Sequence, residues 1–221
     1  RAAFQNDTTG RIGAVGGAVL MRDSNTEYEF NNEPISDYGM ILVPNVCNAE
    51  GHRWFSRIAG CNCAFRRSDL LKIGGFDEFY SYYHDETDLC LRLARTGYDL
   101  CYLNDNPVRH YDAKYDPTRK ITRRNWRIIA RSDTYFSLKN GGDPLCRRLF
   151  KTLSLAPRKP FLRVAWVEYR NRQDRRRGER ILFWMQWIAG FTSGLFQGLF
   201  RRRMLLTEAG TPPPFQPFID G

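Results

Sequence analysis

One stretch, "HDETDLCLRLARTGYDLCYL", constrains the fold more than any other part of the chain. Three carboxylates stand at the start of a helical pattern of leucines. Acidic residues are stabilised in the first turn of a helix and Gly97 is a typical stop, so we expect a helix over residues 86–95. The apolar run that follows predicts a strand. A strand that follows a helix so closely indicates an α/β architecture.

The remaining elements alternate in the same way. Apolar runs predict strands at residues 11–21, 40–46 and 57–67. A short helix "DLLKI" is expected after Ser68, which is a good N-cap. A longer basic helix is expected over residues 119–139, before "NGGDP". We therefore predict an α/β domain with a mixed sheet, followed by C-terminal helices.

Composition divides the chain into three parts. Residues 1–140 hold the predicted α/β domain, residues 141–208 a basic amphipathic helical extension, and residues 209–221 a proline-rich tail. The first 110 residues have a net charge of −4, whereas residues 111–221 have a net charge of +14. A basic half suggests an acidic partner such as nucleic acid, anionic lipid or a phosphorylated substrate. No nucleic-acid motif occurs, so we expect no nucleic-acid partner.

The six cysteines form no recognisable metal pattern. None makes a C-x-x-C pair. Cys61 and Cys63 are expected on one face of a strand, but a second half of a zinc site is missing. We interpret the cysteines as small buried apolar residues of a reduced, cytoplasmic protein.

The segment Ile181–Phe200 contains twenty residues without a charge and is followed by three arginines. Gln186, Ser193 and Gln197 are spaced so that they lie near one helical face. This favours a helix at a membrane interface, with tryptophans and phenylalanines inserted and arginines near anionic headgroups at the inner face of the cytoplasmic membrane. Packing on the chain's own core, an oligomer contact and a membrane span are the alternatives.

The carboxylates of the opening stretch have two explanations. Asp85 is a good N-cap, and Glu86 and Asp88 would suit a first helical turn, so they need be no more than a helix start. Their surroundings favour a chemical site, because an aromatic loop precedes them, Arg92 follows by one helical turn, and His110 follows a strand later.

The ordered motifs "GCNCAFRRSDLLKIGGFDEFYSYYHDETDLCLRLARTGYDLCYLNDNPVRHYD" cover Gly60–Asp112. They resemble the second half of the family-2 glycosyltransferases of the GT-A fold: a G-x-N strand, G-G-F-D-E, E-D-x-D-L-x-x-R, a G-Y strand and a V-x-H turn. The resemblance implies a partial GT-A domain. It places a nucleotide-binding half with a D-x-D motif upstream of this chain, so we expect the chain alone to be inactive.

The resemblance assigns the general base to Glu86, which would deprotonate an acceptor hydroxyl. The order in this chain is D-E in place of E-D, so Asp85 stays open as the alternative base. Asp88 and Arg92 match D-L-x-x-R. We expect them to form an i,i+4 pair that fixes the helix, at the substrate site.

The same resemblance makes His110 a ligand of Mn²⁺ or Mg²⁺ on the nucleotide diphosphate. It implies that Gly60 and Asn62 line the substrate pocket. Tyr83, with Tyr80 and Tyr82 nearby, offers a flat face for a sugar.

The activity implied is inverting transfer of a sugar from a nucleotide-diphosphate donor to a glycan or lipid-linked acceptor, as in synthesis of cell-surface polysaccharide. A non-catalytic module that binds a membrane surface is the alternative.

Overall fold

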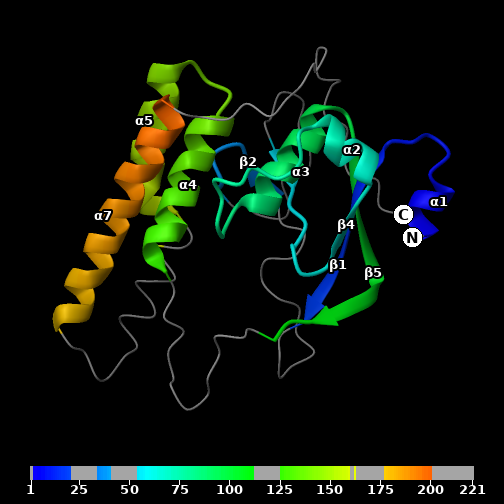
Figure 1. The fold of residues 1–221 in the computed structure, drawn as a ribbon, viewed down its shortest axis with the longest axis horizontal. Helices are drawn as coiled ribbons and strands as arrows, with labels where there is room; N and C mark the ends of the chain where they lie inside the picture. The colour runs from blue at the N-terminus through cyan, green and yellow to red at the C-terminus, as the bar shows by residue number, and fades with distance from the viewer. Residues whose placement is uncertain are drawn as a thin grey trace.

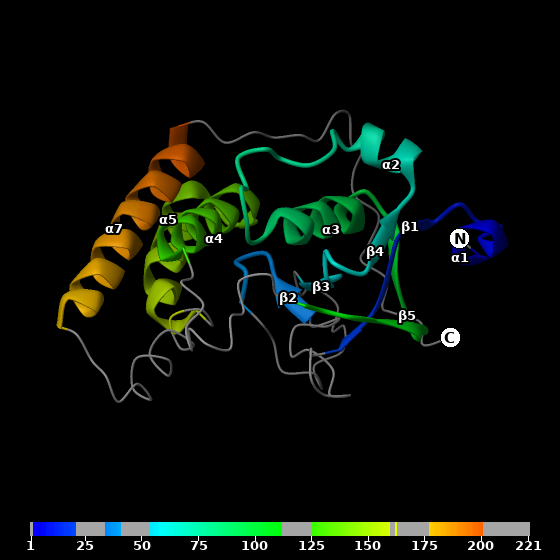
Figure 2. The ribbon, with the colours of Figure 1, turned by 60° about the horizontal axis from the view of Figure 1, so that its bottom comes forward.

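The structure is a computed structural model of the 221-residue chain. It describes residues 2–20, 34–40, 54–111, 125–159, 162 and 177–200. A sheet lies at one end, a layer of helices lies at the other, and α3 lies between them (Figure 1, Figure 2). The predicted α/β class, with a mixed sheet and C-terminal helices, is confirmed.

The main sheet is built around β1 (Ile12–Leu20). β4 (Cys63–Phe65) pairs with it antiparallel, and β5 (Asp99–Arg109) pairs with it in parallel. The strand order is therefore β4-β1-β5. A separate two-stranded sheet joins β2 (Pro34–Ser36) to β3 (Trp54–Ser56). Because β1 and β5 run in parallel, their carboxyl ends meet at one edge, which is where ligands bind in open α/β sheets.

Glycines in β1 allow the loop before β4 to approach the strand closely. A Cβ added to Gly16 would lie 2.4 Å from Cγ2 of Ile58, and one added to Gly17 would lie 2.5 Å from Nδ2 of Asn62. Both distances are too short for real atoms, so neither glycine can gain a side chain without displacing this loop. The strand predicted over residues 57–67 is consequently much shorter, because residues 60–62 form a turn before β4.

Three helices accompany the sheet: α1 (Ala2–Asn6), α2 (Arg67–Lys72) and α3 (Asp85–Arg95). The N-cap of α2 is Arg66, so the prediction that Ser68 caps it is wrong. α3 confirms the predicted helix and ends before Gly97, which has a positive φ of 86°. Its N-cap is His84 and not Asp85, because the helix begins one residue earlier than expected.

The helical layer contains α4 (Trp126–Asn140), α5 (Leu145–Leu155) with a 3₁₀ turn (Ala156–Arg158), and α7 (Arg177–Phe200). Asn125 caps α4 by accepting a hydrogen bond from the amide of Ile128 at 3.2 Å. None of the described helices is long and apolar enough to cross a membrane. Residues 41–46 of one predicted strand, and the tail from residue 201, lie outside the described residues.

The core joins α3 to the sheet on one side and to α4 on the other. Leu89 and Leu93 of α3 are fully buried, as are Tyr135 and Phe136 of α4. Burying an apolar side chain of this size stabilises the fold by about 1.5–3 kcal/mol. α3 is therefore fixed relative to α4, and the position of its first turn depends on that helix.

The cysteines differ from the prediction. Cys90 is buried, but Cys61 and Cys146 are exposed and Cys63 and Cys101 are half-buried. The exposure of Cys61 follows from its place in the turn before β4.

Candidate active site: a carboxylate pair on a strained turn

Asp85 and Glu86 follow a strained turn. The two residues before them, Tyr83 and His84, have φ angles of 72° and 71°. For a residue with a side chain, the left-handed conformation costs about 1–2 kcal/mol. Two such residues in succession persist only where the surrounding structure holds them, and such strain clusters at functional sites.

α4 holds this turn through three consecutive residues. Arg131 donates to the carbonyl of Phe79 at 3.1 Å and to Oγ of Ser81 at 2.8 Å. Ser132 donates to the carbonyl of Tyr82 at 2.9 Å. Asp133 lies 3.1 Å from Nε2 of His84.

His84 is anchored by its contacts with α4. Its ring stacks on Phe136 with centroids 4.6 Å apart. Burial lowers the pKa of His84 below its usual value, so the imidazole is neutral at neutral pH. A neutral ring donates its one N–H to the best acceptor, which for His84 is the Asp133 carboxylate. Lys159 Nζ approaches the same carboxylate oxygen at 3.3 Å, which completes a buried cluster behind the turn.

Glu86 has an unusual electrostatic environment. Burial, and after it the hydrogen bond and charge of Asp85, raise the pKa of Glu86 to about 8. A carboxylate whose pKa lies near the working pH can accept and release a proton efficiently. An acidic residue that only stabilised a helix start would have a lowered pKa, because the helix dipole favours the charged form.

Gly60 lies next to this carboxylate. A Cβ added to Gly60 would lie 3.6 Å from Cδ of Glu86 and 3.7 Å from its Oε2. The turn before β4 and the first turn of α3 are thus in contact. Of the predicted site residues, Gly60, Asp85 and Glu86 are brought together.

Cys63 lies near Glu86, but its thiol is not activated as a nucleophile. Burial, and after it the charge of Glu86, raise the pKa of Cys63 to about 11. The side chain stays a thiol at neutral pH, and its sulfur lies 3.3 Å from the carbonyl of Gly60.

Asp88 and Arg92 form the predicted i,i+4 ion pair, with Nε of Arg92 2.8 Å from Oδ2 of Asp88. Both side chains are almost completely buried. Arg92 also donates to the carbonyls of Ile73 at 2.7 Å and Gly75 at 2.6 Å. The pair therefore fixes the glycine turn after α2 against α3. This burial gives both residues a positioning role, and direct contact with substrate stays a prediction.

The other half of this network was not predicted from the sequence. Lys139 lies 2.8 Å from both Asp77 and Asp88, and Asn140 donates to Asp88 at 2.9 Å. Tyr135 donates to Asp77 at 2.8 Å. The one signal in the sequence was a lysine within the apolar stretch "TYFSLKN" of α4, where an unpaired charge would be costly.

Asn62 joins the turn to the sheet. Its side-chain amide donates to the carbonyl of Ala18 at 2.9 Å, and its own carbonyl accepts from the amide of Gly17 at 3.0 Å. The predicted role in a substrate pocket is not tested by these contacts, which position the loop that carries Gly60.

Tyr83 is half-buried, with its ring 4.2 Å from that of His84, and it packs against the cluster of Trp126, Ile129 and Phe183. Of the three tyrosines in this loop, Tyr80 is buried and Tyr82 is 59% exposed. A stacking role for Tyr83 stays a prediction.

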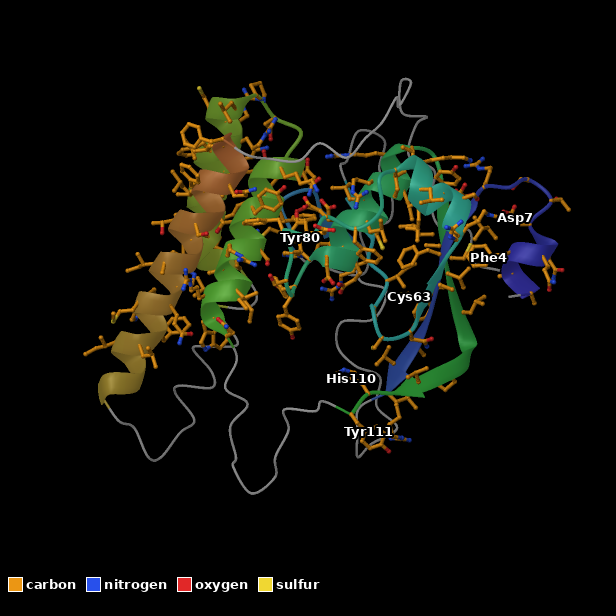
Figure 3. The ribbon with its side chains drawn as sticks, viewed as in Figure 1. Phe4, Asp7, Cys63, Tyr80, His110 and Tyr111 are labelled. Atoms are coloured by element: carbon orange, nitrogen blue, oxygen red, sulfur yellow. The ribbon has the colours of Figure 1, made fainter. Side chains whose placement is uncertain are left out.

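His110 follows β5, and its amide donates to the carbonyl of Leu20 at 3.0 Å. It therefore lies with Tyr111 at the carboxyl ends of the two parallel strands (Figure 3). Among the described residues, no group of three or more His, Cys, Asp or Glu side chains could hold a metal ion. Asp112, the neighbour considered as support for His110, lies outside them. The metal role of His110 stays a prediction.

Comparison with known families identifies the type of domain. Residues 45–114 match the family model described as the N-terminal domain of galactosyltransferase. The chain carries a glycosyltransferase-like domain. The match covers about a third of the chain and includes β4, α2, the strained turn, α3 and β5. It supports a glycosyltransferase domain in general, and family 2 in particular is not shown. No curated protein and no solved structure matches the chain.

Proposed function

We propose that this chain provides the acceptor-activating part of an inverting glycosyltransferase of the family-2 type. The donor is a nucleotide-diphosphate sugar, and the acceptor is a hydroxyl group of a glycan or of a lipid-linked sugar. The observation that carries the proposal is the Asp85–Glu86 pair: a partly buried carboxylate pair on a strained turn, inside the segment that is similar to a glycosyltransferase domain.

Glu86 acts as the general base. The acceptor hydroxyl binds within hydrogen-bond reach of the Glu86 carboxylate, which lies next to Gly60. As the hydroxyl oxygen attacks the anomeric carbon of the donor, its proton passes to Glu86. The bond between the anomeric carbon and the diphosphate oxygen breaks, and the diphosphate leaves with the electron pair. Attack from the face opposite the leaving group inverts the configuration.

Asp85 tunes this base. Its charge and hydrogen bond contribute to the raised pKa of Glu86, so Glu86 carries a proton for part of the time near neutral pH. The base form of Glu86 becomes more abundant as the pH rises through about 8, so transfer should speed up over the same range. Asp85 is the alternative base, since the order of the pair is reversed relative to the family-2 motif.

The family-2 resemblance also implies Mn²⁺ or Mg²⁺, which would stabilise the leaving diphosphate. The described residues do not form a metal site, and the roles proposed for Glu86, Asp85 and Gly60 do not depend on one.

The test is sugar transfer by the natural full-length protein, with a panel of nucleotide sugars and with Glu86→Gln and Asp85→Asn beside the wild type. Loss of a general base lowers turnover by about 10²–10⁴-fold, and donor binding should be unchanged in Glu86→Gln. Glu78→Gln is the matched control, because Glu78 is an exposed carboxylate eight positions earlier, and it should retain activity.

Two other outcomes are informative. If Asp85→Asn alone abolishes transfer, Asp85 is the base. If both variants are as active as Glu78→Gln, the pair is only a helix start. The non-catalytic membrane-surface module then becomes the better account.

A further inference from the structure

α7 packs on α4 through its smallest residues. A Cβ added to Gly190 would lie 2.2 Å from the carbonyl oxygen of Arg127, and one added to Gly194 would lie 2.5 Å from that of Arg131. Gly198 approaches Leu138 in the same way, at 2.6 Å. These glycines recur every four residues and form one stripe, so the backbones of the two helices lie in close contact.

The weakly polar residues of α7 lie on this inner side. Gln186 precedes Gly190 by one helical turn, and Ser193 and Gln197 are adjacent to the other two glycines. All three are half-buried. The face that these residues share therefore lies towards α4, on the same side as the glycine stripe.

Seven of the large apolar residues of α7 face outward, whereas Phe183 is buried against Trp126 and Ile129 of α4. Among the described residues, ten of the sixteen exposed large hydrophobic side chains lie on α5 and α7. We call those on α7 the outer face of α7: Ile181, Leu182, Trp184, Met185, Ile188, Phe196 and Phe200, each more than half exposed. An exposed apolar face of this kind marks an interaction site.

The arrangement reverses that of a surface helix in water. Such a helix buries its apolar side and exposes its polar side. α7 instead buries glycines, weakly polar residues and Phe183, and it exposes leucine, isoleucine, methionine and most of its aromatic bulk at Trp184, Phe196 and Phe200. Small residues at a helix–helix contact, with large apolar residues on the outside, are typical of helices whose outer side meets lipid.

The charges around α7 favour lipid over a second copy of the chain as the partner of its outer face. Residues 170–180 contain six arginines and two acidic residues, and residues 201–203 are all arginine. Positive charge thus flanks both ends of α7. Self-pairing would bring arginines together whether the two helices ran parallel or antiparallel, whereas anionic headgroups would neutralise them.

We propose that the outer face of α7 docks on an anionic membrane surface, with its apolar side chains among the acyl chains and the flanking arginines at the headgroups. α4 lies between this face and the carboxylate turn, since it contacts α7 through Arg131 and the turn through Arg131, Ser132 and Asp133. Docking would therefore place the candidate active site one helix away from the lipid.

The test is vesicle flotation of the full chain, with vesicles of phosphatidylcholine alone and vesicles in which phosphatidylglycerol replaces part of it. We expect binding to the anionic vesicles and weakening by salt, since salt screens headgroup charge. The double variant Met185→Glu/Ile188→Glu should bind on the order of a hundredfold more weakly, because two apolar side chains no longer insert. Leu71→Glu, at an exposed apolar residue of α2, should bind as the wild type does.

Circular dichroism and thermal unfolding establish that each variant is folded, and bromine-labelled lipids should quench tryptophan fluorescence in the wild type. Absence of binding to anionic vesicles, or equal binding by the double variant, would overturn the proposal. A wild-type dimer that the double variant dissociates, with no vesicle binding, would make the outer face of α7 a contact between copies. The proposal stands apart from the proposed reaction, so Glu86→Gln should bind vesicles normally.

Discussion

Two pairs of carboxylates lie at α3, and the protein treats them in opposite ways. Asp77 and Asp88 are buried against Lys139, and Arg92 completes the pairing of Asp88. Burial alone would raise the pKa of Asp77, but the hydrogen bond and charge of Lys139 bring it below its usual value. Glu86 has Asp85 as its neighbour, and burial together with that like charge raises its pKa to about 8.

Under the proposed function, the difference means that environment and not residue type separates a structural acid from a reactive one. A carboxylate that is matched by a cation stays ionised and stabilises the fold. A carboxylate beside another one stays near the point of proton exchange, which is the state that general base catalysis needs. The first pair holds α3 in place so that the second can be presented at its first turn.

Removing the cation of the first pair should have the largest effect. Lys139→Met leaves Asp77 buried without its cation and leaves Asp88 with Arg92 as its remaining cation. Breaking a buried ion pair in this way costs about 3–5 kcal/mol of unfolding free energy, which chemical denaturation would measure. Lys72→Met is the control, because Lys72 is exposed and its partner Asp69 also pairs with Arg66, so its effect should be much smaller. If Lys72→Met lost as much unfolding free energy as Lys139→Met, the buried pairing of Asp77 and Asp88 with Lys139 would not have the special structural role assigned to it.

Neutralising the second pair should change how stability depends on pH. The pKa of Glu86 is about 8 in the folded protein and near its ordinary value of 4.5 when unfolded. The folded state therefore holds the proton more tightly, and this contribution to stability is present below about pH 4.5 and is lost as the pH rises through about 8. Glu86→Gln removes this titration.

Denaturation of both proteins between about pH 5 and pH 9 should therefore show the wild type losing unfolding free energy relative to Glu86→Gln. The Glu78→Gln control should follow the wild type. A difference that does not change with pH would mean that Glu86 titrates normally.

The smallest effect is expected at the turn that presents the pair. Both His84→Gly and His84→Ala remove the contacts with Asp133 and Phe136. Only glycine adopts a positive φ without strain, so His84→Gly should be more stable than His84→Ala by about 1 kcal/mol, measured by chemical denaturation. Equal stability would mean that the turn relaxes in solution when its anchor is lost.

Local patterns in the sequence predicted a good part of this fold. The acidic first turn and Gly97 predicted α3, and the spacing of Asp88 and Arg92 predicted their ion pair. The α/β class followed from the same stretch. Each of these depends on residues within a few positions of one another, where helix geometry and capping preferences apply directly.

What the sequence did not predict depends on contacts between distant residues. Lys139 meets Asp77 across 62 positions, and Asp133 meets His84 across 49. Neither pairing has a local pattern. The positive φ angles of Tyr83 and His84 were also unpredicted, because tyrosine and histidine rarely adopt them and only the anchoring by α4 makes them tolerable.

The most direct test is a ¹³C NMR titration of the side-chain carboxyl groups, with Glu86 assigned through Glu86→Gln. A reactive pair predicts a midpoint for Glu86 near pH 8, moving down in Asp85→Asn, while Asp77 titrates below its usual range. A midpoint for Glu86 at or below 4.5 would show that the carboxylates only stabilise the start of α3, and would contradict the assignment of Glu86 as the base.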